Sequence, residues 1–338
     1  MASPLVTSID WGDVVTTTLE NRSRKLADNI TNNNALLMRL KKKGNMLPFS
    51  GGREIYQELS YATNSTFMWY SGYEPLNIAL NDTMSAARFA IKQCAVAVVI
   101  SGLEEIQNSG DEAMMSLIAE RTSVAESTFN NQMSTGIYSD GTAFGGKQIG
   151  GLALLISKTP TTGTVGGIDA SAQTWWRNVA LNNSTDPLGA FNFTNSTSNN
   201  MQAYFNKATL QVKRNSDGID MIAADTNIYG GYLASLQTIQ RITDDGGEMV
   251  GAGFTALKYY GAGKSVDVIL DGGKGGQIPS STAYFINSDF LKWRPSSARN
   301  FVVIGGERAN VNQDAIVKLS AWAGNMTILN RSLQAVIF

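Results

Sequence analysis

Histidine is absent from this chain of 338 residues, and cysteine occurs only once, at Cys94. Without histidine the chain cannot build a Ser–His–Asp triad, a Cys–His dyad or most kinds of zinc site. One thiol cannot form an intrachain disulfide. Cys94 adjoins the apolar run 95–100, where a thiol usually behaves as a small apolar residue. The composition therefore predicts no catalytic residue, no cofactor-binding residue and no metal ligand.

Long apolar runs and a strong net charge are also missing. No apolar run approaches the length of a membrane-spanning helix, so we expect no membrane partner. The N-terminus, which begins Met-Ala-Ser-Pro, lacks the charged and apolar regions of a secretory signal. The formal net charge of −1 argues against a basic field over a whole domain, as a dedicated nucleic-acid binder would have. Apolar residues make up 43% of the chain, which is enough for a sizeable core.

The strongest periodic pattern lies in residues 109–137. Ser109 stands three positions before Glu112, which is the spacing of a capping box, and Gly136 closes the segment. A helix of this length spans about 40 Å. Its apolar residues recur at steps of three, four and seven, which predicts one buried face: Met114, Leu117, Ile118, Val124, Ala125, Phe129 and Met133.

Two strands are predicted at 53–61 and 86–100, with a change of buried face near Gln93. Such a change indicates a bulge or a passage from one sheet to another. Between the strands, residues 62–85 have no strong pattern but contain four aromatic residues: Phe67, Trp69, Tyr70 and Tyr73. A loop that presents aromatic side chains is suited to a partner. A loop folded back on its own domain is the other interpretation, and the residues alone leave both open.

A local basic stretch precedes the first strand. Between Glu20 and Arg53 there are eight basic and two acidic residues. Residues 19–40 have helical spacing, interrupted at 31–34, and end in Lys41, Lys42, Lys43 and then glycine. Basic residues before a glycine are typical of a helix C-terminus. Contact with nucleic-acid phosphates is the alternative interpretation of the lysines.

The remaining segments mix helices and strands. We expect helices at 170–181, 201–214 and 228–241, and a surface excursion at 182–200 that is rich in Asn, Ser and Thr. We expect strands at 147–157, 219–224, 266–270, 283–287, 301–304, 315–322 and 326–338. There is no internal repeat and no regular alternation of strand and helix. This pattern predicts an α+β fold.

Motifs with known chemistry fail on spacing. The sequence 261–265 (GAGKS) resembles the end of a phosphate-binding loop, but the required earlier glycine is Lys258 and the following residues read as a strand. The adjacent carboxylates at 104–105 and 244–245 point apart in most local geometries. The Asp/Gly-rich turns leave a divalent-ion site open as an alternative, but they lack the D-x-D-x-D-G spacing of a calcium loop. The chain is therefore predicted not to be an enzyme.

The C-terminal region resembles the major capsid proteins of tailed bacteriophages. Residues 284–293 (YFINSDFLKW) resemble the "yflN-dyl-l" strand of that family. Residues 313–315 (QDA), 322–327 (WAGNMT) and a terminal strand over 331–338 resemble its "qda…w-GNlt…r-gvl" ending. The resemblance implies the HK97-like capsid fold, which is α+β. Its parts would be an N-arm (1–48), an extended E-loop with its base strands (49–93), a P-domain (94–149) with the spine helix 109–137, an A-domain (150–232), and remaining strands of both domains (233–338).

The resemblance also implies a function without an active site. Such a protein self-assembles into pentamers and hexamers of an icosahedral phage head that encloses double-stranded DNA. It is located in the virion capsid and is assembled in the cytoplasm of the bacterial host. Its partners would be its own copies, a portal, a decoration protein, packaged DNA and, because Met1 is present, a separate scaffolding protein. The expected subunit-interface residues are Trp11, Arg53, Glu54, Phe67, Trp69, Tyr70 and Tyr73, and those expected to face DNA in the lumen are Lys41, Lys42 and Lys43.

Two alternatives remain beside this interpretation. One is the shell subunit of an encapsulin-like protein compartment, which would enclose protein cargo instead of DNA. The other is a metal-dependent α+β hydrolase that uses carboxylates, which would be a monomer or a small oligomer.

Overall fold

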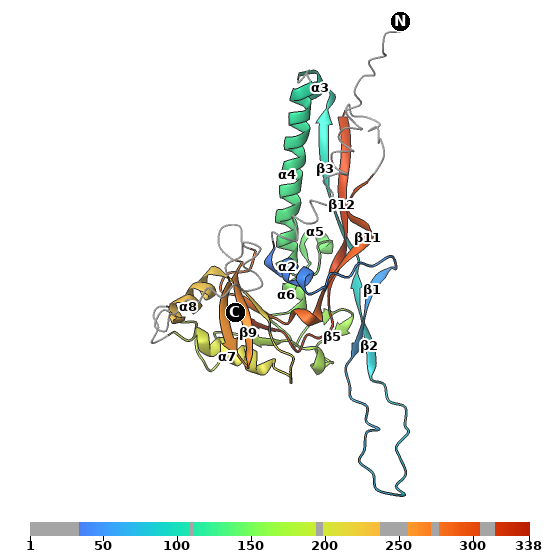
Figure 1. The fold of residues 1–338 in the computed structure, drawn as a ribbon, viewed down its shortest axis with the longest axis vertical. Coiled ribbons are helices and arrows are strands. Elements are labelled where there is room, and N and C mark those ends of the chain that lie inside the picture. Colours follow the sequence, from blue (N-terminus) through green and yellow to red (C-terminus); the bar gives the residue numbers. More distant parts are fainter. Residues whose placement is uncertain (1–33, 108–110, 194–198, 237–255, 272–276, 305–314) are drawn as a thin grey trace. The chain divides into compact units, whose positions relative to one another are not determined.

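The computed structural model describes residues 34–107, 111–193, 199–236, 256–271, 277–304 and 315–338 (Figure 1). The chain divides into two compact units that each combine distant segments. Unit 1 comprises residues 1–51, 92–151 and 293–325, and unit 2 comprises residues 52–91, 152–292 and 326–338. None of the helices in the described part has the length and apolar character needed to cross a bilayer.

Unit 1 is built from one long helix and a three-stranded sheet with the order β11-β12-β3. Strand β12 runs antiparallel to β3, from Ala315 opposite Ser101 to Gly324 opposite Lys92. The first residues of β11 and the last of β12 belong to unit 2. The elements are α2 (Ala35–Lys42), β3 (Lys92–Ser101), α3 (Gly102–Gln107), α4 (Asp111–Tyr138), α5 (Ala143–Gly146), β11 (Leu291–Ile304) and β12 (Ala315–Ile328).

The helix predicted over 109–137 is α4, and its buried face differs in part from the predicted one. Ile118, Phe129 and Met133 are buried as expected, and Phe129 packs edge-on against Phe301 at 5.4 Å between ring centroids. Val124 is instead 61% exposed. It lies six positions after Ile118, and at 3.6 residues per turn that places it on another side of the helix. Thr122 takes the buried position, and its hydroxyl donates to the Ile118 carbonyl oxygen at 2.8 Å.

The predicted capping box at Ser109 and the predicted interruption at 31–34 have different outcomes. Ser109 and the side chains of Glu112 and Met114 lie outside the described residues. The capping box that the structure contains precedes α3, where Ser101 N–H donates to Glu104 and Glu104 N–H to the Ser101 hydroxyl. The expected interruption at 31–34 has a cause at Asn34, whose side chain accepts from the N–H groups of Leu36 and Leu37 and so begins α2.

The chain leaves one sheet and enters another at Ile91, which confirms the change of face predicted near Gln93. Before this residue, β2 (Met84–Ala90) pairs with β1 (Glu54–Ser60). After it, β3 pairs with β12. The two strands are separate because their partners lie in different sheets.

Unit 2 contains a six-stranded sheet with the order β6-β13-β10-β7-β9-β8. Two of its pairs are parallel, β7 with β9 and β13 with β6. The other three are antiparallel, and one of these, β8 with β9, is a hairpin. The strands of this sheet are β6 (Val179–Leu181), β7 (Met221–Ala224), β8 (Ala256–Gly261), β9 (Lys264–Leu270), β10 (Ala283–Ile286) and β13 (Ala335–Ile337). The helices of unit 2 are α6 (Leu152–Leu155), α7 (Met201–Gln211) and α8 (Thr226–Leu236). A small separate hairpin is formed by β4 (Thr164–Val165) and β5 (Ile168–Asp169).

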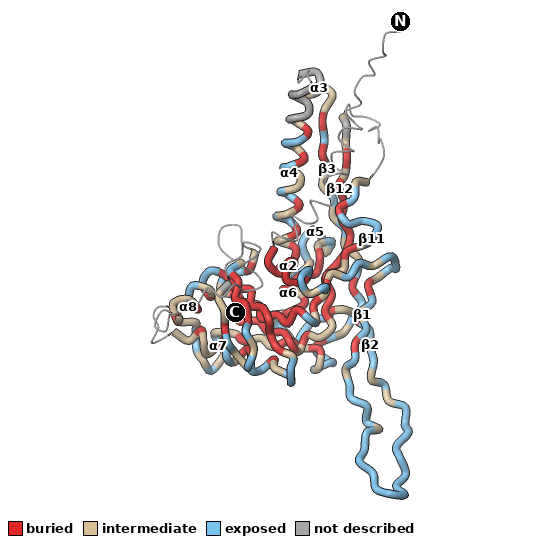
Figure 2. Tube along the Cα trace, in the orientation of Figure 1, coloured by how far each residue is buried: buried red, intermediate tan, exposed pale blue. Residues whose placement is uncertain are grey.

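The core of unit 2 packs α7 and α8 against this sheet. Phe205 on α7 stacks on Tyr232 of α8 at 4.7 Å and contacts Phe285 of β10 edge-on at 5.1 Å. The sheet strands and these helices carry the buried positions in Figure 2. The helix predicted at 201–214 is thereby confirmed as α7, and the described part of the helix predicted at 228–241 is α8.

Two predicted elements are wrong. The strand expected at 147–157 is irregular chain followed by α6. A Cβ atom on Gly151 would lie 2.3 Å from the carbonyl oxygen of Ile137, so a glycine is needed where the backbone passes close to the end of α4.

The helix expected at 170–181 is a 3₁₀ turn, Thr174–Trp176, followed by strand β6. Pairing of β6 with β13 outweighs the helical pattern of 170–181. The terminal strand expected at 326–338 is likewise divided between the end of β12 and β13.

Candidate assembly surface

The β1–β2 hairpin of unit 2 supports the most exposed apolar segment of the described chain. Its register runs from Glu54 opposite Ala90 to Ser60 opposite Met84. One face is buried through Ile55, Leu59 and Phe89. Beyond these strands, residues 61–83 form the long loop that is exposed along almost its whole length in Figure 2. We call this segment the apolar loop.

The root of the hairpin is held by the segment that follows α6. Arg88 N–H donates to the carbonyl oxygen of Gly166 at 2.8 Å. Gly166 has a φ of +63°, and a Cβ atom there would lie 2.9 Å from the Cβ of Ala87. Where the apolar loop begins, the ring of Tyr61 stacks on Trp175 with 5.0 Å between centroids. The hairpin is therefore anchored in unit 2 while the loop beyond it is not.

The predicted aromatic residues lie in this loop and point to solvent. Phe67 is 73% exposed, Trp69 is 88% exposed, and both Tyr70 and Tyr73 are exposed. Phe67 and Trp69 contact each other edge-on at 5.6 Å, and Figure 1 shows their loop extending away from β1 and β2. The alternative prediction of a loop folded back on its own domain is wrong for these residues. Large exposed aromatic groups are typical of interaction sites.

Three further residues of the apolar loop are exposed that were not predicted as interface residues. Leu76, Ile78 and Leu80 are 54%, 93% and 103% exposed. They alternate with Asn77, Ala79 and Asn81, which is the two-residue period of a strand with one apolar face. That alternation is visible in the sequence. It is only five residues long, however, and a pattern of this length also fits an ordinary buried strand.

The other predicted interface residues lie elsewhere. Arg53 is exposed and Glu54 is half-buried, and both stand at the root of β1, at the opposite end of the strand from the apolar loop. Trp11 lies outside the described residues. The structure thus brings the four aromatic residues into one loop and leaves Arg53 and Glu54 apart from them.

The three lysines end α2, as the helix-end interpretation predicts. Lys41 and Lys42 are exposed in its last turn, and Lys43 is the C-terminal capping residue, whose N–H donates to the Arg39 carbonyl oxygen at 3.1 Å. Cations at this end of a helix interact favourably with its dipole. Their contact with DNA stays a prediction.

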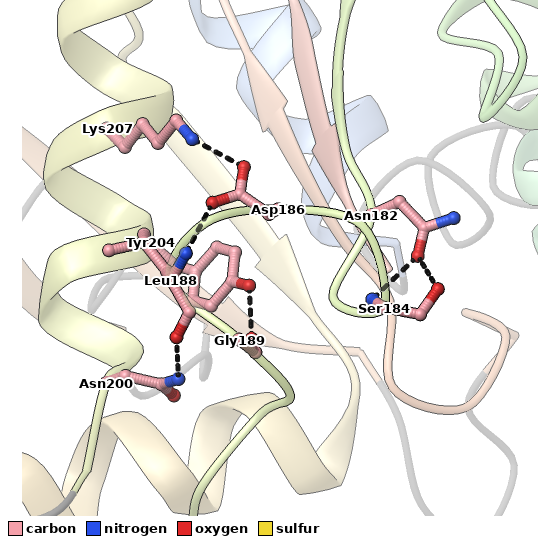
Figure 3. Close-up of polar contacts among 8 residues, drawn as sticks. All are labelled: Asn182, Ser184, Asp186, Leu188, Gly189, Asn200, Tyr204 and Lys207. Carbon is pink, nitrogen blue, oxygen red and sulfur yellow. Dashed lines mark hydrogen bonds and ion pairs between the residues drawn. The ribbon is translucent and has the colours of Figure 1, made fainter.

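Of the predicted surface excursion at 182–200, the structure describes 182–193 and 199–200, and these parts are bound to α7 within unit 2 (Figure 3). Lys207 donates to Asp186 at 2.5 Å, and the Tyr204 hydroxyl donates to the Gly189 carbonyl oxygen at 2.6 Å. Asn200 donates to the Leu188 carbonyl oxygen at 3.1 Å. Burial by itself would raise the pKa of the Asp186 carboxyl, but the hydrogen bonds from Lys207 and from Leu188 N–H outweigh it and lower that pKa. Polar side chains thus hold this segment in place.

Motifs tested for chemistry are structural in the described chain. Ala262 and Gly263, both with positive φ, form the two-residue turn between β8 and β9, so residues 261–265 do not open a helix. Glu104 pairs with Arg121. Residues 244 and 245 lie outside the described part. Among the described residues, no three His, Cys, Asp or Glu side chains are grouped as a metal site requires.

Comparison with solved structures identifies the fold of the chain. No family model matches the sequence, and no curated protein matches it. The solved structure of the cyanophage A-1(L) capsid asymmetric unit is similar, with a TM-score of 0.58 and 15% identity over 88% of this chain and 91% of that chain. A structure from Mycobacterium phage Bobi has a TM-score of 0.51 and 10% identity over 100% and 93%. The capsid of Myoviridae phage XM1 has a TM-score of 0.50 and 11% identity over 88% and 90%. The chain has the α+β, HK97-type fold of phage major capsid proteins.

Proposed function

We propose that this protein is a major capsid protein whose copies assemble into the pentamers and hexamers of an icosahedral phage head around double-stranded DNA. The observation that carries the proposal is the apolar loop, which is anchored at its root and exposes Phe67, Trp69, Tyr70 and Tyr73. The capsid-type fold of the chain supports it.

The physical reason is the apolar area that one chain leaves in water. An aromatic side chain buries about 150–250 Å² when it is covered, and each Å² is worth about 25 cal/mol. Four such residues on one loop approach the area of about 800 Å² that one partner contributes to a standard interface. A loop that contacts a different surface of the next copy makes a heterologous contact, which closes into rings when the rotation allows.

The remaining partners follow from this assignment. Copies of the chain would be the main partner, with a portal, a separate scaffolding protein and a decoration protein joining them. Lys41, Lys42 and Lys43 would meet phosphates of packaged DNA on the inner face. Arg53, Glu54 and Trp11 are further proposed interface residues. The protein would be assembled in the cytoplasm of the bacterial host and would function in the virion capsid without enzymatic activity.

Deletion of the loop tests the proposal. A variant in which residues 62–83 are replaced by a short Gly-Ser linker is expected to fold and to remain unassembled, because strands β1 and β2 and the Tyr61–Trp175 stack stay and the exposed aromatic residues are removed. Circular dichroism checks the folding, and electron microscopy of the variant and the wild type, expressed with and without the phage's other head proteins, checks assembly. Shells of normal size from the variant would overturn the role of the loop. Wild-type shells that contain protein cargo instead of DNA would favour a compartment.

A further inference from the structure

The edge of β3 in unit 1 is closed at the end that leads into α3. This strand is the last in the order β11-β12-β3, so one of its sides has no strand partner among the described residues. Ser101 N–H donates to Glu104 at 3.1 Å, and the Arg121 guanidinium donates to the carbonyl oxygen of Val99. Arg121 also pairs with Glu104. The two charged side chains therefore occupy the backbone groups at this end of the edge.

Along the remainder of the β3 edge, no backbone hydrogen bond to another described residue is present. In an antiparallel pair, the N–H and C=O of one residue point to the same side, and the side alternates along the strand. Since Val99 and Ser101 use these groups away from β12, the alternation turns those of Gln93, Ala95 and Ala97 outward too. All three residues are exposed. An edge with free backbone groups is a template for another strand.

A segment of the apolar loop has the length and pattern to fill this edge. Leu76, Ile78 and Leu80 alternate with smaller or polar residues, as in a strand. Ala79 N–H is taken by the side chain of Asn77 at 3.0 Å, whereas no hydrogen bond of the described chain uses the N–H groups of Leu76, Ile78 and Leu80. The segment 76–80 has as many residues as the open edge 93–97, and both extend about 17 Å.

We propose that residues 76–80 of one copy add to β3 of a second copy as an antiparallel strand, with Ile78 opposite Ala95. Leu80 then lies opposite Gln93 and Leu76 opposite Ala97, and each of these pairs exchanges two backbone hydrogen bonds. The alanines leave room for the larger side chains opposite them. This inference rests on the proposed function and specifies which surface of the neighbouring copy receives the loop.

Charge agrees with this placement. The segment is followed by an acidic residue, Asp82, and the open edge begins beside a basic residue, Lys92. In the proposed register Asp82 lies one residue beyond the position opposite Lys92. At the other end the charge of Arg121 is already balanced by Glu104, so the opposite charges of Asp82 and Lys92 alone favour this register over one shifted along the edge. The sheet is antiparallel between β12 and β3, and antiparallel addition continues that pattern.

Cross-linking between two single variants tests the register. Ile78→Cys chains and Ala95→Cys chains, both with Cys94→Ala, are mixed, assembled and oxidised with diamide. Because each chain has one thiol, a 78–95 disulfide can form only between copies, and we expect dimers to dominate on a non-reducing gel. Leu80→Cys mixed with Gln93→Cys is expected to link, whereas Leu80→Cys mixed with Ala97→Cys, which a parallel strand would join, is expected not to.

The outcomes separate this inference from the proposed function. Shells that form without a 78–95 link, or that link 80 to 97, overturn the antiparallel addition and leave the capsid function standing. Wild-type chains that never assemble, even with the phage's other head proteins, overturn both.

A backbone variant gives a second, independent test. Ile78→Ala and Ile78→Pro both remove the large side chain, but only proline removes the N–H that would donate to Ala95. The loop is exposed, so both variants are expected to fold. We expect the concentration needed for assembly to be about tenfold higher for Ile78→Pro than for Ile78→Ala, the effect of one lost hydrogen bond. Equal values for the two variants would overturn the proposal.

Discussion

The guanidinium of Arg331 lies over the indole ring of Trp176, 5.9 Å from its centroid, and donates to the carbonyl oxygen of the same residue at 3.1 Å. It also donates to the Leu155 carbonyl oxygen at 2.7 Å and to Asn178 Oδ1 at 3.1 Å. Arg331 is fully buried, and burial lowers its pKa to about 10, so it remains charged at neutral pH. One buried cation thus holds three segments of unit 2 together.

Replacement of Arg331 by methionine is expected to destabilise the protein strongly. Methionine fills a similar volume but leaves the carbonyl oxygens of Leu155 and Trp176 without this donor, whereas Asn178 Oδ1 still accepts from Ser157 N–H. Each unsatisfied group costs about 1–3 kcal/mol, so the loss should be about 2 kcal/mol or more. Urea unfolding of Arg331→Met, with Arg331→Lys as the control that keeps the charge, measures it. A change smaller than about 1 kcal/mol for Arg331→Met would contradict this account.

The pair of Asp186 and Lys207 should make stability depend on acid pH. Burial opposes the charged carboxylate, but the hydrogen bonds from Lys207 and Leu188 prevail and lower the pKa of Asp186 below its ordinary value. A lowered pKa in the folded state contributes stability that is complete above the pKa of the unfolded chain, about 4, and is lost as pH falls through the folded value.

Asp186→Asn removes this contribution. We expect the variant to be less stable than the wild type in urea at pH 7, and the difference to shrink as pH falls below about 4. The salt bridge of Arg214 with Asp217 is exposed, so Asp217→Asn serves as a control with little effect. A difference between Asp186→Asn and the wild type that stays constant with pH would contradict the role of this carboxylate.

The stack of Tyr61 and Trp175 is expected to position the root of the apolar loop. An aromatic pair contributes about 0.5–1.5 kcal/mol beyond its buried area. Trp175→Ala should therefore accelerate hydrogen exchange of β1 and β2 and reduce assembly, while Trp175→Phe keeps most of both. Unchanged exchange in β1 and β2 would contradict a positioning role for this stack.

The sequence predicts elements that are determined by local pattern. The long helix α4 was found because its apolar residues repeat over many turns, and the break at Ile91 because the buried face changes parity. Predictions for short segments were wrong where contacts with distant parts of the chain determine the local structure. Residues 147–157 have the composition of a buried strand, but the close approach of Gly151 to the end of α4 cannot be seen in the sequence. Residues 179–181 join a sheet because β13, more than 150 residues later, pairs with them.

In the apolar loop too, some exposed residues were predicted from the sequence and others were not. The aromatic residues of the apolar loop were predicted because their side chains are unusual for a loop. Leu76, Ile78 and Leu80 were not, since a five-residue alternation also fits an ordinary buried strand. The exposure of these three residues can be known only from the structure. The outward backbone groups of β3 are likewise known only from the structure, where Arg121 and Glu104 bind the groups of Val99 and Ser101 that point away from β12.

In the proposed shell, the closed end of the β3 edge has a consequence for the accuracy of assembly. In the proposed addition, Arg121 and Glu104 confine a visiting strand to residues 93–97, so it gains only a few backbone hydrogen bonds. A contact of this size breaks readily when it stands alone and persists only when neighbouring contacts form around it. Misplaced subunits would then dissociate before they are trapped, and a limited strand edge would act as a means of error correction.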